Sequence, residues 1–370
     1  MSSISSTTAG AGNETKTGTR VFSGKVLEQT PSLNLKEDLE NELYQLNFGK
    51  RSNGKKRYIL DKYLGGKQGD SAVYSAKDTR GGGNVALKFV HARDEDVKRR
   101  FKREVAMQSQ LSHPNIVGVK RDEPLSSLDG TLMIAVLEYL PNGSVQQYVQ
   151  QLDDSNPPDE KFVVQMAMDV LNGLICIHRN GIVHKDIKCA NLLRDGLNSS
   201  HFKIADFGIA AMDDTSKSNV SDTMNTMQIR TVGTPHYMSL EHHTGQNVSF
   251  PADLYSLGVV MYRCLSGGKF PYGDQATNAQ MILLALFSSP SVPPINNVSD
   301  PLFAIVTKAL QKQVADRYST ATDMLKDLKN IQPTQKMKPY IFLSYRRSHN
   351  GSARSLKMEL NQLGYEVFFD

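Results

Sequence analysis

The order of hydrophobic and polar positions changes abruptly near the start of the chain. Residues 1–31 are rich in Ser, Thr and Gly and carry few large apolar side chains. Burial there cannot offset the entropy cost of ordering, so the pattern predicts a disordered tail. Residues 32–48 instead repeat leucine at helical spacing, which predicts a helix with one apolar face. These leucines are Leu35, Leu39, Leu43 and Leu46. We expect this helix to pack on the neighbouring domain, with binding of a partner or dimerisation as the alternative.

A basic run, KRSNGKKR at 50–57, follows this helix. Such runs are typical of solvated linkers, and a nuclear-import signal is the weaker alternative. Residues 58–90 then alternate strand-like segments with the turn signals GGKQGD and RGGGN. Residues 95–112 have the pattern of a charged amphipathic helix, and the apolar run at 131–140 predicts a buried strand.

Beyond Pro141 the pattern becomes helical. Two prolines precede a long predicted helix at 159–180 and fix its start. Its apolar face consists of Phe162, Val163, Met166, Val170, Leu171, Leu174 and Ile177. A strand-rich part followed by a helix-rich part indicates an α+β architecture with two lobes.

Composition narrows the class of protein. The 370 residues suffice for one large domain of roughly 250 residues with flanking segments. Apolar residues make up 39% and charged residues 22%, as in soluble globular proteins. No stretch approaches the ~20 consecutive apolar residues of a membrane span, and the N-terminus lacks a secretory h-region. With only three dispersed cysteines, we expect a cytoplasmic protein. The net charge of +5 is explained by a solvated basic surface, and we expect no nucleic-acid partner.

Several motifs with polar side chains follow one another in a fixed order. Lys88 lies in the strand-like VALKFV, and Glu104 lies in FKREVAMQSQLSHPNIV. The segments IVHKDIKCANLL at 182–193 and FKIADFG at 202–208 follow. In order and spacing, these motifs resemble the eukaryotic-type protein kinase superfamily over roughly residues 58–330, which implies the two-lobed kinase fold. Its N-lobe would span 58–140 and its C-lobe 141–330.

This resemblance implies a role for each polar side chain in phosphoryl transfer. Asp186 would accept the proton of the substrate hydroxyl, and Lys188 would neutralise the transferring phosphoryl group. Lys88 would hold the α- and β-phosphates of ATP. Asn191 and Asp206 would coordinate Mg²⁺, a hard cation that prefers oxygen ligands.

Two further residues complete the catalytic set that the resemblance implies. Glu104 would form an ion pair with Lys88 and position it. Thr234, in GTPHYMSLE, would hydrogen-bond Asp186 and Lys188. Lysine at position 188 and Thr234 are both typical of serine/threonine kinases, so the expected substrate is a protein Ser or Thr hydroxyl.

The predicted nucleotide pocket matches the family less closely. In LGGKQGDSAVY at 64–74, the three glycine positions of the phosphate-binding loop are occupied by Gly66, Gln68 and Ser71. Glycine is favoured there because a Cβ would block close approach of the backbone to phosphates. An ordinary hairpin turn is the alternative interpretation of this segment.

The adenine would bind to a hinge formed by LEYL. Backbone groups of Glu138 and Leu140 would bind its edge, with Leu137 as gatekeeper. The remaining residues expected to contact ATP are Leu64, Gly66, Val73, Ala86 and Leu193. Plain core packing is the alternative for the apolar members of this set.

Three downstream residues are expected to support the catalytic loop. Glu241 would form a buried ion pair with Arg317, in ADRYST. Asp253, in ADLYSLGVV, would hold the backbone of the catalytic loop. A surface ion pair or a helix cap is the alternative for these residues.

The C-terminal segment, residues 331–370, has a different pattern. YIFLSYRR is strand-like, a helical face with leucines follows, and YEVFFD is a second strand-like run. This β-α-β order resembles the start of a TIR domain, a flavodoxin-like fold. Because about 35 residues cannot normally bury a core alone, we expect an incomplete TIR domain, with TIR–TIR partners if it is complete in the native gene. An arbitrary C-terminal extension is the alternative.

Three functions remain open at this point. A serine/threonine kinase that uses ATP and Mg²⁺ is favoured, because residues at the predicted reaction centre are intact. A pseudokinase scaffold joined to a TIR adaptor is the alternative, favoured by the degenerate glycine loop. A TIR-type NAD hydrolase with a kinase regulator is the third. The motifs HPNIV, IKCANLL and GTPHYM further resemble the kinases of MAP-kinase cascades.

Two departures from the family predict an unusual mode of regulation. Lys185 stands where an arginine usually grips an activation-loop phosphate, and lysine offers only a point charge. Arg230 lies in the stretch where relatives often carry the phosphorylated residue. Two other positions also depart from the family. Gln108 stands where an apolar residue is usual, and Leu240 stands where proline is usual. Neither position touches the predicted phosphate site.

We therefore predict that kinase activity depends little on activation-loop phosphorylation. Replacing Thr223, Thr226 and Thr231 by Ala should leave much of the phosphotransfer activity, measured with ATP and a generic protein substrate. Complete loss of activity on Thr231→Ala alone would contradict the prediction.

Overall fold

The computed structural model describes a set of ranges separated by gaps. These are residues 57–66, 71–92, 94–121, 124–126, 130, 132–153, 159–195, 201–207, 234–246, 248–331, 340–343, 356, 359–360 and 366–369. The chain divides into two compact units. The first runs to Lys102 and includes Lys120–Tyr139; the second comprises Arg103–Val119 and the chain from Leu140 onward.

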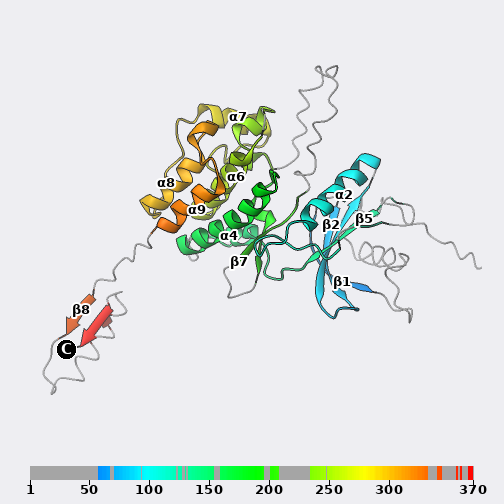
Figure 1. The fold of residues 1–370 in the computed structure, drawn as a ribbon. Helices are drawn as coiled ribbons and strands as arrows, with labels where there is room; N and C mark the ends of the chain where they lie inside the picture. Colours follow the sequence, from blue (N-terminus) through cyan, green and yellow to red (C-terminus); the bar gives the residue numbers. More distant parts are fainter. Residues whose placement is uncertain are drawn as a thin grey trace, which may run out of the picture. The chain divides into compact units, whose positions relative to one another are not determined.

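The first unit is built on one antiparallel sheet (Figure 1). Its strands are β1 (Tyr58–Gly65), β2 (Ser71–Asp78), β3 (Asn84–His91), β4 (Leu125–Ser126) and β5 (Leu132–Glu138). They are arranged in the order β1-β2-β3-β5-β4, and every neighbouring pair is antiparallel. The strands expected in 58–90 and 131–140 are therefore confirmed.

The two faces of this sheet differ in character, because successive side chains of a strand point to opposite faces. On β3, Leu87 and Phe89 belong to an apolar cluster, while Ala86 and Lys88 project to the other face. We call the first the outer face. It comprises Tyr58, Leu60, Ala72, Tyr74, Ala76, Val85, Leu87, Phe89, Leu125, Leu132, Ile134 and Val136.

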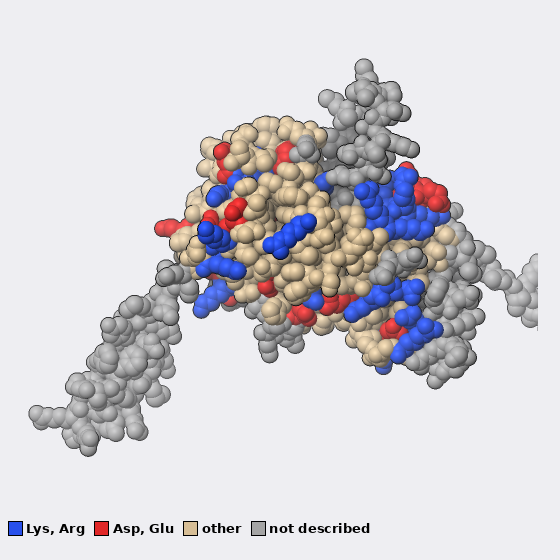
Figure 2. Space-filling model, in the orientation of Figure 1, with Lys and Arg blue, Asp and Glu red and all other residues tan. Residues whose placement is uncertain are grey.

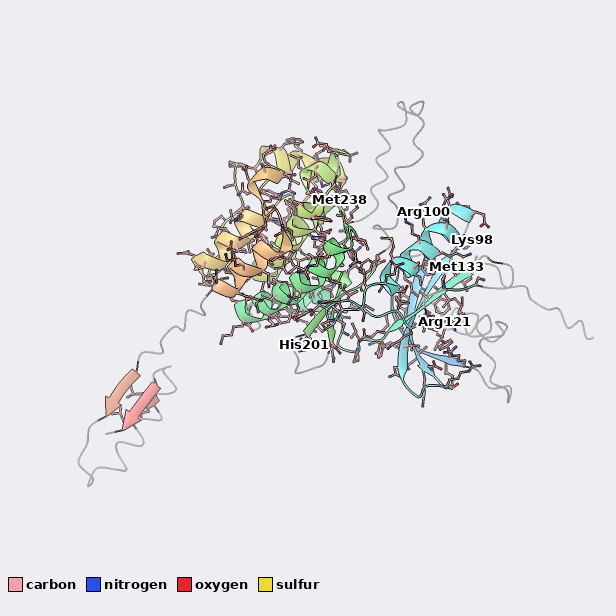
Figure 3. The ribbon with its side chains drawn as sticks, viewed as in Figure 1. Lys98, Arg100, Arg121, Met133, His201 and Met238 are labelled. Carbon is pink, nitrogen blue, oxygen red and sulfur yellow. The ribbon has the colours of Figure 1, made fainter. Side chains whose placement is uncertain are left out.

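Helix α2 (Glu95–Ser109) confirms the amphipathic helix expected at 95–112. Glu95 and Asp96 lie in its first turn, where negative charge suits the helix dipole. Basic residues follow, and Figure 2 shows blue side chains gathered over α2 with red ones at one end. Lys98, labelled in Figure 3, pairs with Glu95 at 2.7 Å, and Arg99 pairs with Asp96 at 2.8 Å. Such exposed pairs contribute little to stability.

The second unit is mainly helical (Figure 1). Its helices are α3 (Val145–Gln150), α4 (Glu160–Arg179), α5 (Leu240–His243), α6 (Phe250–Leu265), α7 (Ala279–Ser288), α8 (Asp300–Ala309) and α9 (Ala321–Asn330), with short 3-10 turns η2 (Cys189–Asn191), η4 (Pro235–Tyr237) and η5 (Val314–Asp316). Strands β6 (Leu192–Asp195) and β7 (His201–Ile204) form an antiparallel hairpin.

Helix α4 confirms the long helix expected at 159–180. Asp159 caps it by accepting a hydrogen bond from the Lys161 backbone N–H. Phe162 is only half-buried and stacks on Tyr148 at 3.9 Å, whereas the rest of the predicted apolar face is buried. By length and composition, α4 alone among the described helices could cross a membrane. Its apolar face lines the core, so packing accounts for its composition.

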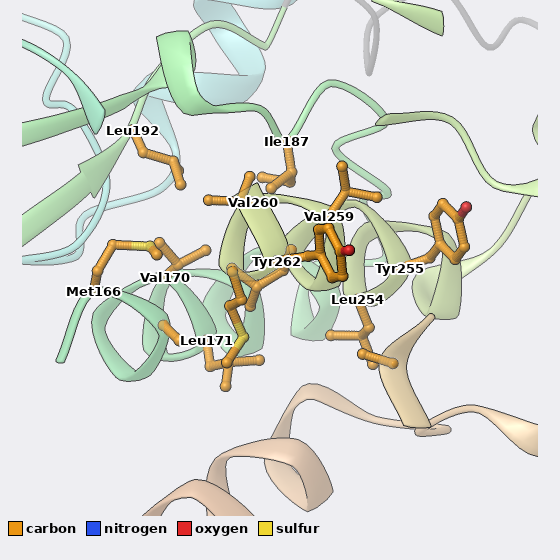
Figure 4. Close-up of a cluster of buried hydrophobic side chains, with 14 of the residues drawn as sticks. Met166, Val170, Leu171, Ile187, Leu192, Leu254, Tyr255, Val259, Val260 and Tyr262 are labelled. Carbon is orange, nitrogen blue, oxygen red and sulfur yellow. The ribbon is translucent and has the colours of Figure 1, made fainter. Parts of the chain in front are cut away.

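The core of the helical unit lies around α4 and α6 (Figure 4). Met166 and Val170 of α4 meet Val260 of α6 there, and Ile187 enters from the loop that precedes β6. Gly258 lets α6 approach α8 closely, since a Cβ would lie 2.9 Å from the Cβ of Ala309. This packing gives the loop containing Ile187 a rigid support.

Two short strands follow the helical region, β8 (Tyr340–Leu343) and β9 (Glu366–Phe369). They pair in parallel, with Tyr340 opposite Glu366 and Leu343 opposite Phe369. A parallel pair requires a crossover connection between its strands. The predicted tail at 1–31 and the leucine-bearing segment at 32–48 lie outside the described residues.

Candidate active site

A single buried carboxylate fixes the loop between α4 and β6. Asp253, on α6, accepts hydrogen bonds from the backbone N–H groups of His184 at 2.9 Å and Lys185 at 2.8 Å. Lys185 has a φ of 64°, a left-handed conformation that is unfavourable for a residue with a side chain. The two hydrogen bonds hold the loop in this conformation, as the sequence predicted for Asp253.

Asp253 is ionised inside the helical unit because hydrogen-bond donors surround it. Burial alone would raise its pKa. His178, in the last turn of α4, donates from Nε2 to Asp253 Oδ2 at 2.8 Å, and the combined donors hold the pKa below its ordinary value. The sequence did not single out His178, because a histidine in the last turn of a helix is explained equally well by the helix dipole.

Asp186 is the centre of a compact polar group. Lys188 donates from Nζ to Asp186 Oδ2 at 2.7 Å. Asn191 donates from Nδ2 to the same oxygen at 2.9 Å and to the Asp186 carbonyl at 2.9 Å. Asn191 therefore fixes Asp186 through its amide nitrogen. Its Oδ1 atom takes no part in these two hydrogen bonds.

Asp206 belongs to the same group. Burial raises the pKa of Asp186, the Asp206 carboxylate adds to the rise, and the Lys188 ammonium opposes it. The backbone joins them as well, since Ala205 N–H donates to the Asn191 carbonyl at 2.9 Å. The structure thus brings Asp186, Lys188, Asn191 and Asp206 together.

Aromatic packing holds the neighbouring backbone in place. Asp206 has a φ of 67°, another left-handed residue with a side chain. The next residue, Phe207, is fully buried and meets the His184 ring edge-on, with the centroids 4.9 Å apart. His184 accepts a hydrogen bond at Nδ1 from the Asp186 backbone N–H at 3.2 Å. The sequence motif predicts no role for His184, which in the structure links the two segments.

In the sheet unit, the predicted ATP-contacting side chains share one face. Lys88 lies opposite Val73 of β2 and Ala135 of β5, and Ala86 lies opposite Leu137. Directly paired residues of neighbouring strands project to the same side. The Lys88 ammonium lies 6.0 Å from the centre of the Phe101 ring of α2. Four predicted residues therefore face the side of the sheet opposite the outer face.

Gly66 occupies a position that only glycine fits. Its φ is +144°, and a Cβ would lie 2.3 Å from the Ser71 carbonyl oxygen. The turn between β1 and β2 therefore depends on Gly66, whereas Gln68 and the rest of 67–70 lie outside the described residues. Leu64, just before it on β1, is exposed.

The other predicted residues occupy varied environments. Glu138 ends β5 and is half-buried, while Leu140 is buried in the helical unit. Leu193 is half-buried on β6, opposite Lys203 of β7.

Glu104 is a buried carboxylate on α2. Lys88 and Glu104 belong to different units, so their ion pair stays a prediction.

Thr234 does not make the contact that was expected of it. Among the described residues, the Asp186 carboxylate receives its side-chain hydrogen bonds from Lys188 and Asn191, and Thr234 donates none to it. Thr234 instead begins η4, where its carbonyl accepts from the Tyr237 N–H at 3.0 Å. Residues 208–233, which precede it, lie outside the described ranges.

No three His, Cys, Asp or Glu side chains converge on a metal position within the described ranges. The predicted ligand set contains one carboxylate, Asp206, and one amide, Asn191, and it stays a prediction. The remaining ligands of a magnesium ion in such a site would be phosphate oxygens and water.

The predicted ion pair of the helical unit is present. Arg317 donates from Nη1 and Nη2 to the two Glu241 carboxylate oxygens at 2.7 and 2.8 Å. It also donates to the carbonyls of Gln311 and Lys312, and its guanidinium lies over the Tyr255 ring. Burial alone would raise the pKa of Glu241, yet the hydrogen bonds and charge of Arg317 hold the pKa below its ordinary value.

Comparison with known proteins now identifies the class. Residues 60–328 match the protein kinase domain family. The chain belongs to this family, and the sheet unit and helical unit correspond to its β-rich and helical lobes.

Two relatives illustrate the similarity, and both are bacterial proteins. The chain is 32% identical to "Serine/threonine-protein kinase PknB" of Mycobacterium leprae over 282 residues, which is 75% of this chain and 43% of the relative. It is also 32% identical to "Serine/threonine-protein kinase PrkC" of Bacillus subtilis over 286 residues, 76% of this chain and 41% of the relative. The chain thus spans about two fifths of the length of these relatives.

We predict that the Glu241–Arg317 pair is a large contribution to the stability of the helical unit. Glu241→Ala leaves a buried guanidinium without its partner, so the free energy of unfolding should fall by about 3–5 kcal/mol in chemical denaturation. The matched control is Lys308→Ala, which breaks the exposed pair with Asp327 at 3.9 Å. That change should cost less than about 1 kcal/mol. Equal effects of the two substitutions would contradict the prediction.

Proposed function

We propose that the chain is an ATP-dependent serine/threonine protein kinase that transfers a phosphoryl group to a protein hydroxyl. The observation that carries the proposal is the polar group of Asp186, Lys188 and Asn191 on the loop that Asp253 fixes, together with Asp206 on the segment after β7. Membership of the protein kinase family and the printed names of the relatives support it.

Each member of the group fits one requirement of phosphoryl transfer. Asp186 is positioned to take the proton of a bound Ser or Thr hydroxyl, because Lys188 and Asn191 fix its carboxylate. Lys188 places a positive charge beside the base, where negative charge develops on transferring oxygens. The chain's residues thus mainly position and stabilise charge, as this reaction demands.

The donor set also fits magnesium–ATP. Asn191 and Asp206 would hold the metal through oxygen atoms, and the metal would neutralise the phosphate charge. Lys88 would bind phosphate oxygens, and Val73, Ala86 and Leu137 would offer apolar surface on the same face of the sheet. A bent turn that tolerates only glycine at 66 would let the backbone approach phosphates closely.

We also propose that residues from Tyr340 onward form the beginning of a TIR-like β-α-β unit. The parallel pairing of β8 with β9 supports it, because the flavodoxin-like fold starts with two parallel strands. Antiparallel strands in an experimental structure would contradict this assignment. The likeness to kinases of MAP-kinase cascades stays a prediction, since the relatives reported above carry the names PknB and PrkC.

The kinase proposal predicts a strong dependence on Asp186. Asp186→Asn keeps the shape of the side chain but removes the base, so transfer of labelled phosphate from magnesium–ATP should fall by about 10²–10⁴-fold. The matched control is Asp195→Asn, on β6, which should retain activity because Asp195 lies in a strand outside the polar group. Equal incorporation by wild type and Asp186→Asn would instead favour the pseudokinase scaffold.

A second prediction concerns pH. Burial raises the pKa of Asp186, and Lys188 opposes that rise. The base must be ionised to act, so the rate falls on the acidic side as pH drops through this pKa. Lys188→Met removes the opposing charge, so the acid limb of the kcat profile should move to higher pH.

Lys188→Arg is the control for this experiment, because it retains the positive charge. Its acid limb should stay close to that of wild type even if kcat is lower. An unchanged limb in Lys188→Met would show that the titrating group is not Asp186.

A further inference from the structure

The loop that carries Asp186 is fixed at its start by Asp253, but the residues after Asp186 form only one short turn. This turn, η2, begins at Cys189, directly after Lys188, and ends at Asn191. A single 3-10 turn has poor hydrogen-bond geometry and little stability of its own, so side-chain contacts must set its position. Since Lys188 and Asn191 both donate to Asp186, the contacts that hold this turn also position the proposed base.

Cys189 is the buried anchor of this turn. Its side chain is 0% exposed, and its sulfur is hydrogen-bonded by the side chains of Cys264, Tyr237 and Arg263. Cys264 and Arg263 are neighbours on α6, whereas Tyr237 ends η4. A thiol usually packs in a core as a small apolar group, and its sulfur is only a weak acceptor. Three polar partners around one thiol therefore indicate a directed contact rather than plain packing.

Arg263 is the rigid end of this contact. Its Nη1 atom donates to the Tyr237 hydroxyl at 2.5 Å and to Gln146 Oε1 of α3 at 3.2 Å. Its Nε atom donates to the Gly268 carbonyl at 3.1 Å, and the guanidinium lies 4.2 Å from the centre of the Phe270 ring. The planar guanidinium is thus held from several segments at once, which suits a group that has to orient others.

Tyr237 connects this support to the turn. Because its oxygen accepts a hydrogen bond from the charged Arg263, its own O–H is a stronger donor toward the Cys189 sulfur. The backbone of Tyr237 is held as well, since its carbonyl accepts from Ser256 Oγ of α6 at 2.8 Å. Tyr237 is therefore fixed at its side chain and at its backbone, and its hydroxyl passes that fixed position on to Cys189.

We propose that Cys189 is a positioning residue for phosphoryl transfer, an inference that rests on the proposed kinase function. Tyr237 and Arg263 hold its sulfur, and the turn that begins at Cys189 then keeps the partners of Asp186 at hydrogen-bonding distance. Cys189 acts through this turn and not on the reacting atoms. The thiol sets the direction of the turn, which apolar packing alone would leave free to shift.

Substitutions of Cys189 in the full chain separate the hydrogen bonds from packing. Cys189→Ala and Cys189→Ser leave similar volumes empty, but only serine keeps an acceptor for the Tyr237 hydroxyl. The kcat for transfer of labelled phosphate from magnesium–ATP should fall about 10-fold in Cys189→Ala and stay within about threefold of wild type in Cys189→Ser. Packing alone predicts the opposite order, because a buried hydroxyl is less favourable than a methyl group. A kcat of Cys189→Ser at or below that of Cys189→Ala would overturn the proposal. Cys176→Ala, at a half-buried thiol of α4, is the control and should keep the wild-type kcat.

Removal of the Tyr237 hydroxyl tests the same contact from its other side. Tyr237→Phe should speed amide hydrogen exchange over residues 186–191, a measurement that needs no catalysis, and should lower kcat about 10-fold. Tyr262→Phe, at another buried tyrosine of α6 (Figure 4), is the matched control and should change neither. Adding Tyr237→Phe to Cys189→Ala should lower kcat no further, because both changes break one contact. Unchanged exchange in Tyr237→Phe, or full additivity of the two changes, would contradict the positioning role.

The positioning role and the kinase function fail in different ways. Transfer by wild type that is no greater than transfer by Asp186→Asn would overturn the kinase function and this inference with it. Wild-type transfer well above that level, matched by Cys189→Ala and Tyr237→Phe, would overturn the positioning role alone.

Discussion

A fully buried carboxylate organises the helical unit of this protein. Asp253 reaches from α6 to two consecutive backbone N–H groups of the loop and to His178 of α4. A buried charge without partners would be strongly destabilising. Each hydrogen bond that Asp253 accepts stabilises its charge and also gives a donor group its partner. Three segments distant in sequence therefore share one electrostatic centre. The position of Asp186 depends on this centre rather than on local helix or strand structure.

The sheet unit uses a different constraint, the alternation of side chains along strands. Because Lys88 pairs with Val73 and Ala86 pairs with Leu137, strand pairing alone places these side chains on one face of the sheet. The opposite face carries the apolar cluster of strand side chains. A shift of one residue in the register of β3 would exchange the two sets. The apolar core and the proposed nucleotide contacts thus fix the same register.

The sequence predicted the elements well where periodicity was strong, as in α4, α2 and β5. It also predicted the Glu241–Arg317 pair and the role of Asp253, because the family resemblance supplied long-range partners that a pattern cannot. It did not predict His178, whose partner is defined only once α4 and α6 pack together. Gln108 was noted only as a departure, yet it is buried and donates to the Val117 carbonyl at 2.8 Å, a bond that depends on tertiary structure.

Two residues with side chains have a left-handed backbone conformation at the polar group: Lys185, next to Asp186, and Asp206, which belongs to the group. Each such residue costs of order 1 kcal/mol and persists only because its surroundings leave no alternative. Loosening those surroundings would let the two backbones relax into ordinary conformations while the helices remain folded. The conformation at Lys185 and Asp206 is therefore a property of the surrounding tertiary structure and not of the helices that carry it.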